Sequence, residues 1–159
     1  MSYDNHQYFN TMNGNDEVTT VTPAADKCIL TPSKPIKVIR WGYIATTVLG
    51  SSALVAALDF RPTAGVDTAR VDAWGGTITP GHATARGTGV QHTLTTGEGD
   101  RDAPIPEAVV VPGEELVIQV TTVASSGAVY WFIEYQPLSN SEFSYLTTGS
   151  SGNMTEKAS

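Results

Sequence analysis

The chain has 159 residues and a formal net charge of −7, and only 16% of its residues are charged. This length supports one domain with a single hydrophobic core. Binding to nucleic acid needs clustered lysine and arginine, whereas the nine basic residues here are scattered along the chain. We therefore exclude nucleic acid as a main partner. Attraction to a protein surface with some positive charge, or solubility alone, explains the acidity.

Cysteine use and the N-terminal sequence indicate where the protein is made. Cys28 is the only cysteine, so no disulfide can form within the chain, and its neighbours Ile29 and Leu30 predict a small buried side chain. The first ten residues have neither the basic start nor the apolar segment of a signal peptide. No apolar stretch approaches the roughly 18 residues of a membrane span. We predict synthesis in the cytosol and no membrane partner.

The first segment, residues 1–16, is polar and rich in asparagine, and it carries the separated aromatic residues Tyr3, Tyr8 and Phe9. Such a composition cannot bury enough apolar surface to fold alone. A frayed terminus is one interpretation. The other is an extended N-terminal arm that lies across a neighbouring protein and inserts these rings. We take Tyr3, Tyr8 and Phe9 as candidate partner-binding residues on this second interpretation.

Residues 17–138 contain short β-prone runs, separated by turn signals at intervals of about eight to twelve residues, as in a sandwich or barrel. Pro112-Gly113 is typical of a type II turn, in which proline fixes one φ and glycine supplies a positive φ. Residues 51–58 include helix formers, but the segment is short and lies between Gly50 and Pro62, so we predict a strand there. The predicted strands are 17–22, 27–31, 36–49, 53–61, 69–74, 90–96, 107–111, 115–123 and 128–137.

Alternation of side-chain character assigns faces to the longer strands. In the last two strands, apolar residues recur at every second position, which places them on one face of a sheet. They are Leu116, Ile118 and Val120 in the first, and Val129, Trp131, Ile133 and Tyr135 in the second. In the run 36–49, the same spacing groups Ile39, Trp41, Tyr43 and Ala45, and Gly42 is a candidate position for a bulge.

Eight or nine strands without a central helix predict an all-β fold, a single antiparallel β-sandwich of the jelly-roll type with about eight strands. The sandwich domain spans 17–138. Residues 139–159 form a polar, flexible C-terminal tail, either a frayed end or a second arm that uses Phe143 and Tyr145. The segments 75–89 and 97–106 are long loops, and loops of such length often carry function.

No combination of residues predicts a catalytic or metal centre. A cupin-type enzyme needs a His-x-His pair with a nearby glutamate, but His82 and His92 are ten residues apart and His6 lies in the arm. The acidic run 98–102 alternates carboxylates as a calcium loop does, yet it lacks the glycine and the bidentate glutamate of that motif, so a hydrated loop is the simpler reading. Nucleophile elbows and phosphate-binding loops are also missing. We predict a protein that is not an enzyme and uses no cofactor or metal.

The three tryptophans are candidates for a platform on which sugars stack. Trp131 and Trp41 belong to alternating apolar faces, so we predict that both lie in the core. Trp74 precedes Gly75-Gly76 at the end of a predicted strand, and its position leaves core and surface equally open. We therefore keep Trp74 as a fourth candidate partner-binding residue.

The end of the domain resembles a known family. Residues 112–122 read PGEELVIQVTT and residues 129–137 read VYWFIEYQP, and this strand pair is similar to the C-terminal strands of jelly-roll virion proteins of tailed bacteriophages. Head decoration (cement) proteins are the best match in style. The earlier strand IKVIRWGY at 36–43 and the exit DFRP at 59–62 are similar too, and the likeness extends over about residues 25–138 as a pattern.

The resemblance implies a virion structural protein that binds the major capsid protein on the capsid surface and stabilises the shell. It also implies self-association, as a homotrimer at three-fold positions. A carbohydrate- or receptor-binding module of a fibre is the alternative from another class, and a tail or baseplate component is a close relative of the first reading. The cupin-type enzyme is disfavoured by the histidine spacing.

Overall fold

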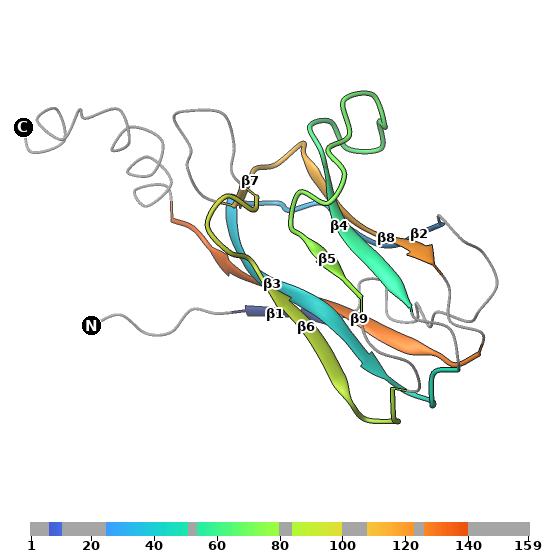
Figure 1. The fold of residues 1–159 in the computed structure, drawn as a ribbon. Helices are drawn as coiled ribbons and strands as arrows, with labels where there is room; N and C mark the ends of the chain where they lie inside the picture. The colour runs from blue at the N-terminus through green and yellow to red at the C-terminus, as the bar shows by residue number, and fades with distance from the viewer. Residues whose placement is uncertain are drawn as a thin grey trace, which may run out of the picture.

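A computed structural model describes residues 7–10, 25–50, 54–79, 84–99, 108–122 and 126–139. These residues contain strands and no helix (Figure 1), so the predicted all-β class is confirmed. The strands are β1 (Gln7–Asn10), β2 (Ala25–Leu30), β3 (Ile36–Ala45), β4 (Val55–Arg61), β5 (Thr77–Ile78), β6 (Gly89–Thr93), β7 (Val109–Val110), β8 (Glu115–Thr122) and β9 (Val129–Pro137).

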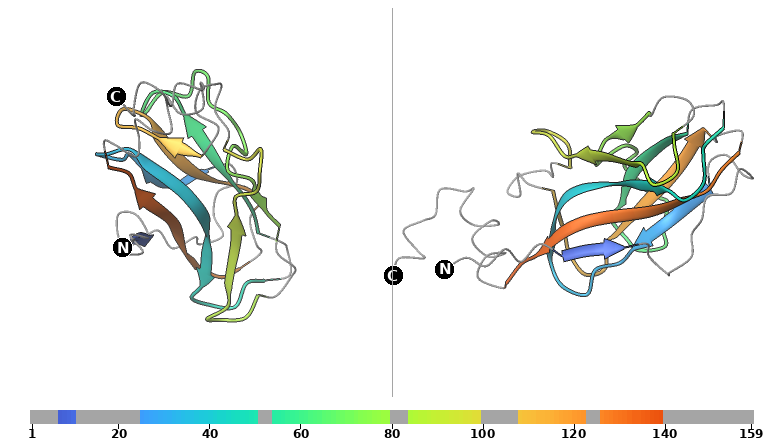
Figure 2. Two further views of the ribbon diagram at one scale, coloured as in Figure 1. Left: turned by 90° about the vertical axis from the view of Figure 1, so that its left-hand side faces the viewer. Right: turned by 90° about the horizontal axis from the view of Figure 1, so that it is seen from below.

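The strands form two antiparallel sheets that lie face to face (Figures 1 and 2). One sheet has the order β1-β9-β3-β6, and β7 pairs with the start of β3 beyond the end of β6. The other sheet has the order β2-β8-β4-β5. Sequence-distant strands are therefore neighbours, and the long strands β3, β9, β4 and β8 occupy the centres of the two sheets.

The core lies between the sheets and is built from the alternating residues of the central strands. Trp41, Tyr43 and Trp131 are at most 1% exposed, and the Tyr43 and Trp131 rings meet edge to face with centroids 5.4 Å apart. The predicted inward faces of β8 and β9 are confirmed for all residues except Tyr135, which is only partly buried. Cys28 is 1% exposed, as the sequence predicts.

A bulge in β3 lies three residues before the predicted one. The pairing of β3 with β9 shifts register between Val38 and Arg40, so Ile39 is the extra residue. An extra residue reverses the alternation of faces. Ile36 and Val38 therefore share the core face with Trp41, whereas the prediction had placed Ile39 there. The predicted bulge at Gly42 is wrong, because Gly42 pairs in register with Phe132 and Gln91.

Two further predictions differ from the structure. Residues 69–74 form turns with one isolated bridge from Val71 to Phe60, and the strand of this region is the two-residue β5 that follows. The arm contains β1, a strand that the polar composition of residues 1–16 did not suggest. The turn at Pro112-Gly113 is confirmed, since Gly113 has φ of +95° and the Glu114 amide donates to the Val111 carbonyl.

The segment 75–89, predicted as a loop, contains β5 in its described part. Other predictions about segments lie outside the described residues. They concern the strand 17–22, most of the loop 97–106 and all but the first residue of the tail 139–159. Within the part of the chain that the structure describes, there is no helix of the length and hydropathy that crossing a bilayer requires.

Candidate partner-binding surface

The predicted aromatic anchors do not come together at one described site. Tyr3 lies outside the described residues. Tyr8 and Phe9 belong to β1, where they occupy the register positions opposite Glu134 and Ile133 of β9. The arm segment thus pairs with its own domain at the edge of one sheet. Its contribution to binding a partner stays a prediction.

Trp74 belongs to the hydrophobic core, where it contacts β4. Its ring stacks on Phe60 with centroids 5.1 Å apart and an interplanar angle of 25°, and the residue is 7% exposed. A ring this deeply buried offers little surface to a partner or a sugar. Of the two readings that the sequence left open for Trp74, the structure favours the core.

The most elaborate polar arrangement surrounds Arg61, the last residue of β4. Arg61 is 5% exposed, and its guanidinium forms ion pairs with Asp26 at 2.5 Å, Asp67 at 2.7 Å and Glu115 at 3.0 Å. These carboxylates come from β2, from the loop after β4 and from β8. A planar guanidinium with five N–H donors is the side chain that can serve three carboxylates at once. Arg61 therefore ties the loop to three strands of one sheet.

Arg70 forms a second set of ion pairs from within the same loop. It lies 2.7 Å from Asp59, 3.0 Å from Asp26, 3.1 Å from Asp67 and 3.8 Å from Asp72. Asp59 is fully buried, and its other carboxylate oxygen accepts a hydrogen bond from the Ala73 amide at 2.7 Å. We call the two arginines and their five carboxylates the arginine network, which comprises Arg61, Arg70, Asp26, Asp59, Asp67, Asp72 and Glu115.

Charge balance in the arginine network explains its pKa shifts. Burial opposes the charge on Arg61, but the hydrogen bonds that Arg61 donates to Glu115, Asp67 and Asp26 outweigh burial and raise the Arg61 pKa. Burial opposes the charge on Arg70 as well, but the contacts with Asp26, Asp59 and Asp67 outweigh burial and raise the Arg70 pKa above its ordinary value. The hydrogen bonds of Asp67 with Arg61 and Arg70 lower the pKa of that carboxyl group. These shifts all favour the charged forms of Arg61, Arg70 and Asp67.

A second polar cluster joins the edges of the two sheets. His92 of β6 lies 2.8 Å from Glu98, and Trp41 of β3 donates its indole N–H to the Gly75 carbonyl at 2.6 Å. The Gly99 amide donates to the Trp74 carbonyl at 2.5 Å. We call this group the edge clasp; its members are Trp41, Trp74, Gly75, Gly76, His92, Glu98 and Gly99. It connects β6 in one sheet to the segment that leads into β5 in the other.

Gly76 shows how tightly the edge clasp is packed. It has φ of +84°, a conformation that side-chain-bearing residues rarely adopt. A methyl group at this position would overlap the His92 ring nitrogen and approach Glu98 Oε1 to 2.9 Å. Glycine at this position therefore lets the two sheet edges meet.

Glu98 is the electrostatic centre of the edge clasp. Burial disfavours its charge, but hydrogen bonds from the Thr95 amide, from His92 and from the Thr95 hydroxyl outweigh burial and lower the Glu98 pKa below its ordinary value of 4.5. A carboxyl group whose pKa is lower in the folded state stabilises that state above its unfolded pKa. This stabilisation is lost as the pH falls through the folded pKa.

We therefore expect Glu98→Gln to change how stability depends on pH. At pH 7 the variant should lose about 1 kcal/mol of unfolding free energy, because charge-assisted hydrogen bonds to a partly exposed carboxylate are removed. Below pH 4.5, the ordinary pKa of the group, the difference from wild type should shrink toward zero. Urea unfolding between pH 3 and 7 measures both effects. Asp72→Asn, at an 83% exposed side chain, is the control, and a difference for Glu98→Gln that is constant over this range would contradict the assignment.

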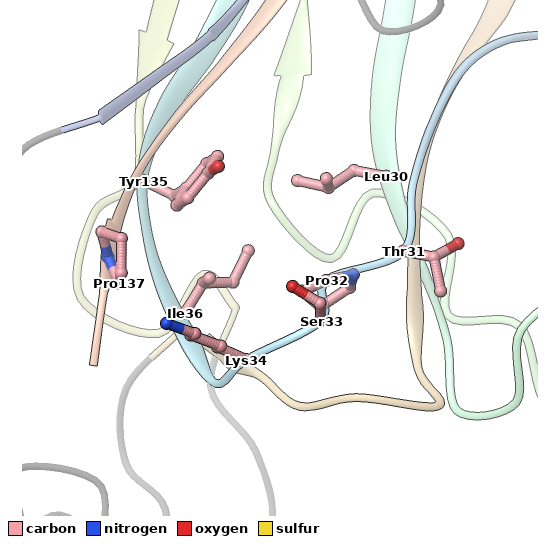
Figure 3. Close-up of a pocket in the computed structure, with 8 residues that line it drawn as sticks. All are labelled: Leu30, Thr31, Pro32, Ser33, Lys34, Ile36, Tyr135 and Pro137. Carbon is pink, nitrogen blue, oxygen red and sulfur yellow. The ribbon is translucent and has the colours of Figure 1, made fainter. Parts of the chain in front are cut away.

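A pocket of about 320 Å³ opens where the connection from β2 to β3 meets the end of β9 (Figure 3). Leu30, Ile36 and Tyr135 point toward one another across it, and the exposed residues Ser33 and Lys34 lie on the connection at its rim. The lining is mixed: apolar side chains alternate with the hydroxyl groups of Thr31, Ser33 and Tyr135 and the ammonium group of Lys34, and none of the described lining residues is a carboxylate, a histidine or a cysteine.

The buried charged residues of the described part hold the structure together. There are five, and each has a structural partner: Asp59 and Arg61 in the arginine network, Glu115 with Arg61, Glu134 with Arg40, and Glu114 with the Val111 amide. No group of three or more metal-ligating side chains occurs among the residues that the structure places. Of the acidic run 98–102, the carboxylate of Glu98 is engaged in the edge clasp, and residues 100–102 lie outside the described ranges.

Sequence reasoning missed the arginine network. The segment 59–72 does hold a signal, because it alternates two arginines with Asp59, Asp67 and Asp72 in a chain that is otherwise poor in charge. The other two carboxylates, Asp26 and Glu115, lie 35 and 54 residues away from Arg61 in the chain and approach it only through strand pairing. Comparison of the chain with protein families, with curated proteins and with solved structures found no match.

Proposed function

We propose that this protein is a capsid decoration protein, which binds a virus shell and stabilises it through contacts between proteins. The viral setting comes from the resemblance of residues 112–137 to the C-terminal strands of phage virion proteins. The observation that carries the non-catalytic, structural role is the use of the five buried charged residues. All of them brace loops and strands, and none lines the pocket.

A jelly roll is the form of sandwich that the strand pairing supports best. The antiparallel pairs are nested: β1 pairs with β9, β2 with β8, β3 with β6 and β7, and β4 with β5. A long hairpin folded over on itself has this nesting, and the added pairs β3–β9 and β4–β8 close the roll into two sheets. Jelly rolls are common in viral capsid proteins.

The scaffold suits a mechanical role without disulfides. The arginine network fastens the loop after β4 to β2 and β8, and the edge clasp joins the two sheets. Three protomers around a shell axis would add stability that one core of this size does not provide. A mass measurement of the free protein tests this part of the proposal, since a stable monomer would argue against a homotrimer.

The arm is the first proposed contact with the shell. Its aromatic residues Tyr3, Tyr8 and Phe9 would gain contact area by ordering on a neighbouring surface. Part of the arm, β1, pairs with β9 at the edge of the sheet, and no other described strand pairs with it, so the shell would meet this stretch as an edge strand.

Deleting residues 1–16 should lower the affinity for shells assembled from the matching capsid protein by about ten-fold or more, since aromatic anchors dominate interface energetics. Co-sedimentation with these shells measures the loss, and urea unfolding checks that the remaining domain folds. Deleting residues 1–6 alone keeps β1 and separates the contribution of Tyr3 from that of Tyr8 and Phe9. Unchanged occupancy after removal of residues 1–16 would refute the role of the arm.

The carbohydrate-binding alternative has less support. It needs exposed aromatic rings, whereas Trp41, Trp74 and Trp131 are 0%, 7% and 1% exposed. A glycan array and fluorescence titration with sugars would separate the two functions, because tryptophans this deeply buried should not be quenched by a sugar.

A further inference from the structure

The loop between β4 and β5 has an unusual construction. We call residues 62–73 the braced loop; in Figure 1 it is the green segment that extends beyond the end of β4. A connection of this length is usually mobile on the surface of a domain. Here Arg61 at its start and Arg70 within it form seven ion pairs with carboxylates.

Backbone contacts brace the loop as well. The Ala64 amide donates to the Gly113 carbonyl at 2.9 Å, and the Gly65 amide donates to Glu115 at 2.7 Å. Val71 and Phe60 exchange two backbone hydrogen bonds of 2.8 and 3.0 Å. A segment held at so many points has already lost its conformational freedom, so little further entropy is lost when it binds a partner.

The braced loop also holds backbone strain. Ala69 and Ala73 have φ of +64° and +53°, and they are the only residues other than glycine with positive φ in the described part of the chain. Such conformations persist where the surrounding structure enforces them, and they gather at functional segments. Glycine at either position would have relieved the strain. The loop is therefore built to keep one shape.

The surface that this shape presents is apolar and acidic. Val66 and Val71 are among the most exposed large apolar side chains of the described residues, at 41% and 43%. Each is followed directly by an aspartate, and the side chains of Asp67 and Asp72 are 69% and 83% exposed. The hydrogen bonds with Arg61 and Arg70 keep the Asp67 pKa low, which preserves its charge. Apolar residues beside fixed negative charges match a partner surface that combines apolar side chains with positive charges.

We propose that the braced loop is a preformed docking surface for a protein partner that surrounds an apolar depression with lysine or arginine side chains. The inference rests on the proposed function, under which this partner is the capsid shell. Val66 and Val71 fill the depression, and Asp67 and Asp72 face its basic rim. The loop is a second contact, independent of the N-terminal arm.

The test compares three variants of the full chain with wild type in co-sedimentation with shells of the matching capsid protein. The double variant Val66→Ser/Val71→Ser removes the apolar contacts, and Asp72→Lys reverses the most exposed charge. Val48→Ser is the control, because Val48 is 57% exposed and lies outside the loop. We expect roughly ten-fold weaker binding for the double variant and for Asp72→Lys, and less than about two-fold change for the control.

The outcomes separate the two proposals. Shells that fail to bind wild type overturn the proposed function and this inference together. If wild type binds and the double variant binds as tightly as Val48→Ser, only the inference is overturned. Urea midpoints equal to wild type show that each variant is folded. If the double variant is unfolded, Asp72→Lys decides, because it should also flatten the decrease in binding with rising salt.

Discussion

Replacing Arg61 with alanine is expected to lower the free energy of unfolding by about 3–5 kcal/mol, because it leaves buried charge without a partner. Among the described residues, Glu115, which is 5% exposed, would keep the Gly65 amide as a donor, and Asp26 and Asp67 would each keep Arg70 but lose Arg61. The ion pairs by which Arg61 links Asp67 of the braced loop to Glu115 of β8 are lost, while the hydrogen bond from the Gly65 amide to Glu115 remains. Urea or thermal unfolding at pH 7 measures the loss.

Two comparisons separate this effect from the general cost of removing an arginine. Arg86 is exposed, so Arg86→Ala should change stability by no more than about 0.5 kcal/mol. Arg61→Lys should lie between alanine and wild type, because one ammonium group cannot reach three carboxylates in the geometry of a guanidinium. A stable Arg61→Ala variant would mean that solvent already screens the arginine network.

Gly42→Ala is expected to destabilise the domain by about 3 kcal/mol, the upper part of the range for overpacked cores. Gly42 lies at the centre of a sheet, between Phe132 of β9 and Gln91 of β6. An added methyl group would overlap the Val90 carbonyl oxygen and approach the Gln91 Cα to 2.8 Å. Both obstacles are backbone atoms of the neighbouring strand, so a change of rotamer cannot relieve them, and β6 must move.

Gly89 offers a matched control on the strand that would have to move. Gly89 belongs to β6, where it lies opposite Ile44 of β3, and it is exposed. The nearest atoms to an added methyl group are 3.9 Å away. Gly89→Ala should therefore leave stability unchanged or raise it by a few tenths of a kcal/mol, since glycine weakens a strand interior. If both alanine variants behave alike, the close approach of β6 to Gly42 is not a constraint on the fold.

The fold could be predicted where local pattern and burial agree. In β9, the apolar residues Val129, Trp131 and Ile133 stand at every second position, and all three are buried. In β3 the pattern failed in one half, because the bulge at Ile39 reverses the faces and nothing in the local sequence marks it. The prediction placed the bulge at Gly42 instead. Glycine occurs there for another reason, because the backbone of β6 lies too close for a side chain.

The candidate surfaces were harder to predict because they depend on contacts between distant segments. Asp26, Arg61 and Glu115 are unremarkable in sequence, and only strand pairing collects them into the arginine network. Composition argued against structure in residues 1–16, yet β1 forms there because β9 supplies hydrogen-bond partners for its backbone. Trp74 could not be placed from sequence either, since it lies in a turn and the residue on which it stacks, Phe60, belongs to the strand β4.

The pairing of β1 with β9 has a practical consequence for engineering. Gln7 lies opposite Tyr135, so the two ends of the described domain lie on adjacent strands, which are about 4.8 Å apart in a sheet. Cargo fused before β1 and cargo fused after β9 would therefore emerge side by side. On a particle that carries many copies, two different enzymes fused in this way would be held as neighbours without any designed linker between them.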